Sequence, residues 1–269
     1  MTATTLPQPQ SQPRALHTPR FIDLETIRML TERDVMRFLR ERAQLYGSLA
    51  RTIVWLFVLG AGLRGSITIP GDVPYLAYVF PGMLAMAIIF ACFQSAVSVI
   101  FDREFGFLKE ILVAPTPRSS IVIGKALAGA TIATMQGVII FLFAPLAGVH
   151  LTPFSVVACI LVMLLAGLGL TATGLCFAAR MTSFEGFGTV NNFIILPLYF
   201  ASGAQFPLDR APQWMQTLAL LNPLAYTVDL LRGLLIGMWS FPAWVNLAVL
   251  IVFAVVALGA ATWSFRQTE

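Results

Sequence analysis

Residues 80–125 read FPGMLAMAIIFACFQSAVSVIFDREFGFLKEILVAPTPRSSIVIGK, in which a charged, proline-bounded segment separates two long apolar runs. Within ten positions this segment carries five charged side chains: Asp102, Arg103, Glu104, Lys109 and Glu110. The whole chain of 269 residues is 58% hydrophobic and 11% charged, and its mean hydropathy is +0.81. A soluble domain is usually about 45–50% apolar and about 25% charged. The composition therefore indicates an integral membrane protein.

Runs of about 20 mostly apolar residues, the length that crosses the hydrocarbon core, predict the membrane spans. Six such runs are found, at residues 45–63, 75–100, 121–149, 152–179, 187–203 and 244–265. Pro81 and Pro145 lie inside the second and third runs, where a proline indicates a kink more often than an end. Arg51 lies near the start of the first run, and its long side chain can reach the headgroups. The predicted fold class is an all-α membrane protein with six transmembrane helices.

A further apolar stretch, residues 219–238, is interrupted by polar and charged positions: Asn222, Pro223, Asp229 and Arg232. Pro223 disfavours helical geometry at the residue before it, and charged residues are costly in the middle of a bilayer. We expect short re-entrant helices that enter and leave the outer half of the membrane, with a seventh full span as the alternative. Asp229 and Arg232 can pair to stabilise this turn or to gate an outer exit.

The distribution of lysine and arginine predicts the orientation of the chain. All 17 basic residues except Arg64, Arg210 and Arg232 lie on one side of the six-span arrangement. Because basic residues concentrate on the cytoplasmic side of membrane proteins, both termini and the loop 101–120 are expected in the cytoplasm.

Two segments precede the first predicted span. Residues 1–20 are rich in Pro, Gln and Thr, and we expect a disordered cytoplasmic tail rather than a signal peptide. Residues 21–44 place apolar side chains, among them Ile27, Leu30 and Phe38, at roughly helical spacing, with arginines mostly elsewhere on the helix. A basic amphipathic helix beside a membrane is expected to lie in the interface. Its role is either anchoring alone or also contact with a partner.

Residues 101–112 are predicted to form a second amphipathic helix. Its apolar stripe consists of Phe101, Phe105, Leu108 and Leu112, whereas Asp102, Arg103, Lys109 and Glu110 fall off that stripe. Pro115 and Pro117 end this helix, and Ser119 and Ser120 can cap the next one, whose cytoplasmic end carries Arg118 and Lys125. In the cytosol the stripe must be covered, either by the protein's own spans or by another protein.

Residues that could carry chemistry are few. The glycine-rich GAGLRGS at residues 60–66 lacks the lysine of a phosphate-binding loop. No cluster of His, Cys and carboxylate residues has the spacing of a metal site. Asn191, Asn192 and Gln136 are polar groups in or near spans, which can contact a cargo or hydrogen-bond between helices. We expect no cofactor bound by this chain and no nucleic-acid partner.

Residues 80–137 resemble the permease subunit of type-2 ABC transporters, in particular the branch called daunorubicin resistance or multidrug efflux permeases. The stretch NPLAYTVDLLRG, residues 222–233, is similar to the segment that this family carries before its last span, and residues 41–63 extend the likeness. The resemblance thus covers most of the chain after the tail. It implies an interfacial helix at 21–44 and a type-2 ABC transmembrane domain at 45–269.

The resemblance also implies a division of labour between subunits. In the family, a cytoplasmic coupling helix between the second and third spans docks on a separate ABC ATPase subunit, which uses ATP and Mg. The residues implied to make that contact are Phe101, Asp102, Arg103, Glu104, Phe105, Gly106, Phe107, Leu108, Lys109 and Glu110. Short re-entrant helices are implied at about 205–236. Two permeases, as a homodimer or a heterodimer, are implied to face each other around the pathway within membrane lipid.

The implied function is export of a hydrophobic or amphipathic substrate, a drug-like compound or a lipid, across the plasma membrane, which in bacteria is the inner membrane. A lipid-linked glycan is an alternative cargo, and an ion-driven secondary transporter is the alternative class. Ion-driven carriers commonly hold carboxylates at mid-membrane, whereas the acidic residues here map to loops or edges, with Asp229 the nearest exception. The chain itself is not expected to be an enzyme.

Overall fold

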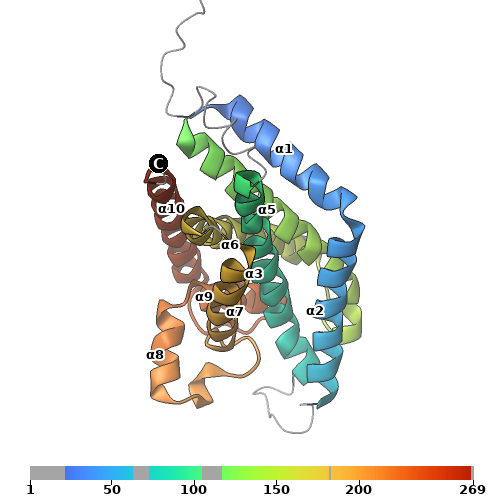
Figure 1. Ribbon diagram of the computed structural model, residues 1–269. Coiled ribbons are helices and arrows are strands. Elements are labelled where there is room, and N and C mark those ends of the chain that lie inside the picture. Colours follow the sequence, from blue (N-terminus) through green and yellow to red (C-terminus); the bar gives the residue numbers. More distant parts are fainter. Residues whose placement is uncertain (1–21, 63–72, 105–116, 182, 268–269) are drawn as a thin grey trace, which may run out of the picture.

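The computed structural model describes residues 22–62, 73–104, 117–181 and 183–267, which form helices and turns and contain no strand (Figure 1). The helices are α1 (Leu24–Arg40), α2 (Arg42–Gly62), α3 (Tyr75–Glu104), α5 (Arg118–Ile140), α6 (Pro153–Arg180), α7 (Phe184–Phe200), α8 (Gln213–Leu221), α9 (Pro223–Ile236) and α10 (Ala243–Arg266). Short 3-10 turns occur at Phe141–Phe143, Pro145–Ala147 and Leu208–Arg210. The predicted tail 1–20 lies outside the described residues.

Four of these helices, α3, α5, α6 and α10, are long and apolar enough to cross a membrane. They match four of the predicted spans, with one correction. The third span was expected to continue to Val149, but α5 ends at Ile140 and two 3-10 turns follow. Pro145 begins the second of these turns, where its missing N–H and its ring oppose a continuing α-helix.

The predicted first and fifth spans are helical, but their apolar helical segments are shorter than those of the four candidate spans. α2 contributes the apolar stretch Tyr46–Val58, and α7 has 17 residues. α8 and α9 together form a bent pair that passes as one further span by length and composition. Among the described residues the structure therefore gives four candidate spans, or up to five, and the count of six stays a prediction.

α6 lies in the middle of the bundle, where it packs against α3, α5 and α10. Small residues allow this packing, as they commonly do between membrane helices. At Gly167 of α6 an added Cβ would lie 2.9 Å from the Cα of Ala130 in α5, closer than real side chains approach backbone atoms. This close contact fixes α5 against the centre of the bundle and thereby positions the polar side chains of α5.

α1 packs against α5 rather than standing apart from the bundle. Ile27, Leu30 and Phe38, expected to face the acyl boundary, are buried inside the protein. The backbone of α1 also approaches α5 closely, since a Cβ on Gly124 would lie 3.2 Å from the Cα of Ile27. These three side chains of α1 are therefore covered by protein, whereas Leu24 and Leu39 of the same predicted apolar set are 77% and 41% exposed, and the interfacial placement of α1 stays a prediction.

Both ends of the described chain lie at the same end of the molecule, with α8 at the opposite end (Figure 1). The Asp23 N–H, just before α1, donates to Ser120 Oγ at 2.7 Å. Arg118 Nη1 donates to the carbonyls of Phe265 and Arg266 at 3.2 and 3.1 Å. The start of α1, the start of α5 and the end of α10 are thus held together.

The predicted cap of α5 is wrong. Pro117 occupies the N-cap position and no side chain caps the helix, so Ser119 and Ser120 lie within its first turn. The Ser120 hydroxyl instead accepts the hydrogen bond from Asp23. A residue that suits a cap by type is used here to attach another helix.

Candidate functional site

Four charged side chains from three helices meet where α1 crosses α3 and α5: Arg33 and Asp34 of α1, Asp102 of α3 and Lys125 of α5. Lys125 Nζ lies 2.6 Å from Asp102 Oδ2 and 3.3 Å from Asp34 Oδ2. Arg33 Nη2 lies 2.8 Å from Asp34 Oδ1 and 3.0 Å from Asp102 Oδ2. Each cation contacts both carboxylates, and the four charges sum to zero. We refer to these four residues as the ionic cluster.

The ionic cluster is largely buried. Lys125 is 1% exposed, Asp34 5% and Asp102 6%. Lys125 Nζ also donates to Ser98 Oγ at 3.1 Å. Burial lowers the pKa of the Arg33 guanidinium, but the carboxylates of Asp34 and Asp102 raise that pKa by more, to above its ordinary value. Since buried charges are tolerated only when they are paired and hydrogen-bonded, α1 can leave α3 and α5 only at a large cost in free energy.

The predicted coupling residues fall partly within this region. Phe101–Glu104 form the last turn of α3, and Phe105–Glu110 lie outside the described residues. The Phe101 ring packs against Phe184 of α7 with centroids 4.2 Å apart, and the Arg37 guanidinium lies 5.3 Å from its centroid. Glu104 is exposed. The last turn of α3 thus contacts both α1 and α7.

Asp102 differs from the expectation most clearly. It was placed off the apolar stripe, on the side available to a partner's charges, but its carboxylate is buried against Lys125 and Arg33. The reason is that α3 continues to Glu104, so Asp102 keeps the helical phase of the span and faces α1 and α5.

Sequence reasoning missed the ionic cluster, although one signal was present. Lys125 lies seven residues after the start of α5 in a run that is otherwise apolar, and a lysine in that setting needs a partner. Asp102, near the end of the neighbouring span, was an available partner. The participation of Arg33 and Asp34 could not be predicted from the sequence, because it depends on where α1 packs against α3 and α5.

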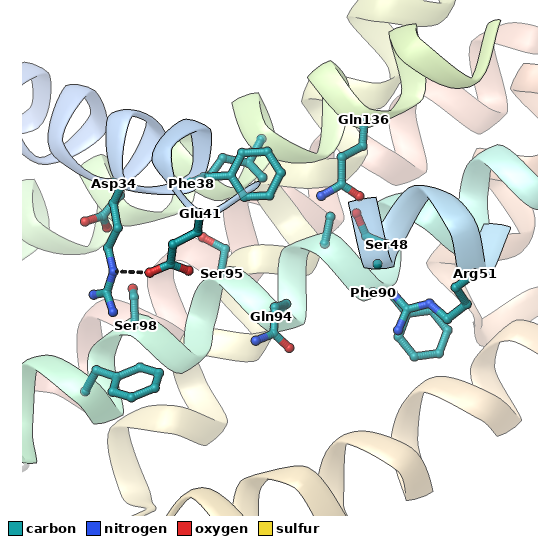
Figure 2. A pocket seen from close by; sticks show the side chains of 15 residues that line it. Asp34, Phe38, Glu41, Ser48, Arg51, Phe90, Gln94, Ser95, Ser98 and Gln136 are labelled. Atoms are coloured by element: carbon teal, nitrogen blue, oxygen red, sulfur yellow. Dashed lines mark hydrogen bonds and ion pairs between the residues drawn. The ribbon is translucent and has the colours of Figure 1, made fainter. Parts of the chain in front are cut away.

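A cavity of about 470 Å³ adjoins the ionic cluster, between the end of α1, α2, α3 and α5 (Figure 2). Asp34 and Ser98 belong both to its wall and to the surroundings of Lys125. The remaining wall carries amides, hydroxyls, aromatic rings and the guanidinium of Arg51. Within the described parts of the chain no group of three or more His, Cys, Asp or Glu residues can hold a metal.

Two side chains of the cavity were singled out from the sequence. The guanidinium carbon of Arg51 lies 4.1 Å from the centroid of the Phe90 ring of α3, while the residue is exposed, so its reach to the headgroups stays a prediction (Figure 2). Gln136 of α5 is 4% exposed, lines the cavity, and forms no hydrogen bond with any other described residue. It therefore does not bridge helices among the described residues, which was one of the two roles expected for it.

At the other end of the molecule the predicted break at Asn222 and Pro223 is confirmed. The axes of α8 and α9 differ by 88°, and α9 begins at Pro223. Asn222 Oδ1 accepts from the Leu224 N–H at 3.0 Å, which caps α9. Its Nδ2 donates to the Leu198 carbonyl of α7 at 2.6 Å, so one side chain joins α9 to α7.

Asp229 of α9 anchors the start of α10 and is not paired with Arg232. Its carboxylate accepts from the N–H groups of Ser240 and Phe241 at 2.7 and 3.0 Å, and from Asn246 Nδ2 at 2.7 Å. The expected ion pair between Asp229 and Arg232 is therefore replaced by separate contacts.

Arg232 is 6% exposed and contacts the turn that follows α7. Its Nη2 donates to the Gly203 carbonyl at 2.9 Å, and its guanidinium carbon lies 3.9 Å from the centroid of the Tyr78 ring of α3. Asp229 and Arg232 thus connect α9 to different neighbours, which makes both residues part of the packing around the bent pair.

Comparison with known proteins places this architecture in a family. Residues 25–236 match the model of the ABC-2 type transporter family. The transport permease ycf38 of Cyanophora paradoxa is 29% identical over 238 residues, which cover 87% of this chain and 81% of the relative. Nodulation protein J of Rhizobium leguminosarum bv. trifolii is 32% identical over 197 residues, 72% of this chain and 75% of the relative. The inner membrane transport permease YadH of Escherichia coli K12 is 25% identical over 248 residues, 90% and 94% of the two chains.

The family match includes α1, the four residues of the ionic cluster and the bent pair of α8 and α9. The matched relatives extend over most of this chain, and two of the three are named transport permeases. The resemblance noted at residues 80–137 is thereby confirmed over the larger part of the chain. This protein belongs to the ABC-2 type transporter family and resembles its transport permeases.

Proposed function

We propose that the chain is the transmembrane subunit of an ATP-driven exporter that moves a hydrophobic or amphipathic compound out across the plasma membrane. ATP hydrolysis would occur in a separate ABC ATPase, with which permeases of this family normally work. The observation that carries the proposal is the attachment of α1 to the ends of α3 and α5 by the ionic cluster, at the end of the molecule where α3 ends at Glu104. That end would be cytoplasmic, as the distribution of basic residues predicts.

Residues 101–110 are proposed to couple the ATPase to the spans in two ways. Phe105–Glu110 would contact the ATPase directly. Phe101 and Asp102 would transmit the movement, because they join the last turn of α3 to α1, α5 and α7. An ATPase can shift the arrangement of the spans only through contacts that differ between its states, and the contacts of the last turn of α3 with three other helices can pass such a difference on.

The face of α1 that points away from the other helices is proposed to lie along the membrane surface. The inner apolar residues of α1 pack on the protein, but Leu24, Met29 and Met36 are 77%, 58% and 49% exposed. Exposed arginines of the same helix, such as Arg28, suit anionic headgroups. Movement of α1 would then change contacts both at the membrane surface and in the ionic cluster.

Two permeases are proposed to assemble around one pathway, in six-span subunits with α2 and α7 completing the count. The cargo is proposed to be amphipathic, a drug-like compound or a lipid, with a lipid-linked glycan as the alternative. The cavity beside the ionic cluster supports an amphipathic cargo, because it combines polar groups with aromatic rings.

The proposal can be tested with Glu110→Ala in the full-length permease. The permease would be co-expressed with a candidate ABC ATPase from the same genome, and the purified complex would be assayed for ATPase activity in lipid. We expect wild type to co-purify with the ATPase and Glu110→Ala to lose coupling while still inserting into the membrane. Glu185→Ala is the matched control, because Glu185 is an exposed carboxylate in the first turn of α7, next to the residues around Phe101.

Equal ATPase activity in Glu110→Ala, Glu185→Ala and wild type would remove the coupling role of residue 110. Failure of the wild-type permease to bind the ATPase would contradict the proposed function as a whole. Transport driven by an ion gradient without the ATPase would favour a secondary transporter instead.

A further inference from the structure

We propose that the cavity between α1, α2, α3 and α5 binds the anionic headgroup of a membrane amphiphile, with Arg51 contacting the anionic group. The inference deepens the proposed function, because it assigns a chemical class of cargo or bound lipid to one place in the permease. It rests on the proposed function only for the origin of the ligand. Binding itself can be measured without ATP, a partner or transport.

Among the described residues that line the cavity, every charge but one cation has a counter-charge. Asp34 belongs to the neutral ionic cluster, and Glu41 Oε1 lies 3.2 Å from Arg37 Nε. Arg51 contacts the face of the Phe90 ring but forms no ion pair with any described residue. The planar guanidinium can donate two parallel hydrogen bonds to a phosphate or carboxylate, and a cation inside a membrane protein is commonly a functional residue.

Uncharged polar side chains of the same cavity also form no hydrogen bond with other residues that the structure describes. Gln136 is 4% exposed, and its amide extends from α5 into the cavity toward α2 (Figure 2). Gln94 and Ser95 of α3 line the same cavity, and like Gln136 they form no hydrogen bond with other described residues. Because a buried polar side chain nearly always has a hydrogen-bond partner, the buried Gln136 indicates a site for a polar ligand, to which the half-buried Ser95 and the exposed Gln94 can add contacts. Their amides and hydroxyl can both donate and accept.

The surroundings of the cavity suit an amphiphile more than a free anion. Arg51 and Gln94 are exposed, so the cavity opens to the surface of the bundle beside α2. One and two helical turns beyond Arg51, the apolar side chains of Trp55 and Val58 are 40% and 57% exposed. A volume of about 470 Å³ holds a headgroup, and the apolar tail would continue along this exposed surface of α2.

The cavity also borders the ionic cluster, so a bound ligand would lie next to the residues proposed to transmit movement from the ATPase. Asp34 and Ser98 lie in its wall and both contact Lys125. A headgroup in the cavity would therefore favour one position of α1 relative to α3 and α5. By this route an amphiphile can change the response of the permease to its ATPase.

The test measures binding of phosphatidylglycerol to the full-length permease in detergent by native mass spectrometry, with phosphatidylcholine of the same acyl chains as the neutral comparison. We expect one phosphatidylglycerol per chain to bind with clear preference. Arg51→Gln should weaken that binding at least about tenfold, since a hydrogen-bonded charge is lost, whereas Arg51→Lys should retain part of it. Arg180→Gln is the control, because Arg180 also lies over an aromatic ring, Trp263, but does not line the cavity.

Three results would overturn the inference. The first is equal weakening by Arg51→Gln and Arg180→Gln, which would mean general attraction to basic residues. The second is equal binding of the two lipids, and the third is saturable binding of inorganic phosphate without preference for phosphatidylglycerol. Because Arg51 is exposed, Arg51→Gln should fold, and a monodisperse elution profile would confirm it. Failure of this binding test would leave the proposed transport function untouched, and failure of the ATPase test would leave the binding result standing.

Discussion

Replacing Lys125 with Met would leave two buried carboxylates facing one remaining cation. In wild type, Lys125 Nζ lies 2.6 Å from Asp102 and 3.3 Å from Asp34, and the side chain is 1% exposed. After the change, only Arg33, whose side chain is 32% exposed, would compensate both carboxylates. The variant therefore places one net negative charge in the contact between α1, α3 and α5.

The size of the effect follows from the burial of the pair. Removing one partner of a buried ion pair commonly costs about 3–5 kcal/mol. Because Arg33 still contacts both carboxylates, we expect a loss of about 3 kcal/mol in the free energy of unfolding, at the low end of that range. For a chain of this size such a loss lowers Tm by about 6–12 °C.

The measurement is thermal unfolding of the purified permease in detergent, compared with a matched surface variant. Arg28→Met removes an ion pair of similar N···O distance, 2.7 Å, from the same helix α1, but there the side chains of Arg28 and Glu32 are 79% and 61% exposed. Solvent screens an exposed pair strongly, so Arg28→Met should lower Tm only slightly. Adding Asp102→Asn to Lys125→Met should recover part of the loss, because it restores a neutral contact of Arg33 with Asp34.

The reasoning would be refuted if Lys125→Met lowered Tm no more than Arg28→Met does. Additive effects would also refute it: if Asp102→Asn lowered the Tm of the Lys125→Met variant by as much as it lowers the Tm of wild type, the two residues would act independently.

Two further predictions concern packing and the bent pair. Gly167→Ala should destabilise the permease by about 1–3 kcal/mol, because the new methyl would meet the backbone of α5. Gly259→Ala in α10 has free space for the methyl and should be neutral or stabilising. Thermal unfolding compares the two variants, and equal Tm values would contradict the close contact of α6 with α5. Asn222→Ala removes the cap of α9 and the hydrogen bond to the Leu198 carbonyl, so it should lower the free energy of unfolding by about 1–3 kcal/mol and increase proteolysis near the bend. Resistance to proteolysis equal to that of wild type would contradict the role of Asn222.

The sequence was sufficient for the features that depend on local chemistry. Apolar runs of membrane length gave α3, α5, α6 and α10, and Pro223 gave the break between α8 and α9. Both signals act through the residues of the segment itself, namely the need to satisfy backbone groups in lipid and the restricted geometry before a proline.

Contacts between distant segments were not predictable in the same way. The periodicity of residues 21–44 gave a helix with an apolar side, but periodicity cannot distinguish burial in lipid from burial against α5. For the same reason, Asp102 was expected to face a partner, and Asp229 was expected to pair with Arg232 three residues away. In the structure Asp102 meets α1, and Asp229 meets the residues before α10, because these partners are brought close only by tertiary packing.

The central claim, that the loop after α3 contacts an ABC ATPase, is tested most directly by site-specific photo-crosslinking. A photoreactive residue would replace Glu110 in one sample and Trp239 in another, with the co-expressed ATPase present in membranes. Trp239 lies between α9 and α10 and lines a pocket with Gln216 of α8, the helix at the opposite end of the molecule from the start of α1. We expect a covalent product of permease and ATPase from position 110 and none from position 239. No product from position 110, or equal yields from both positions, would contradict it.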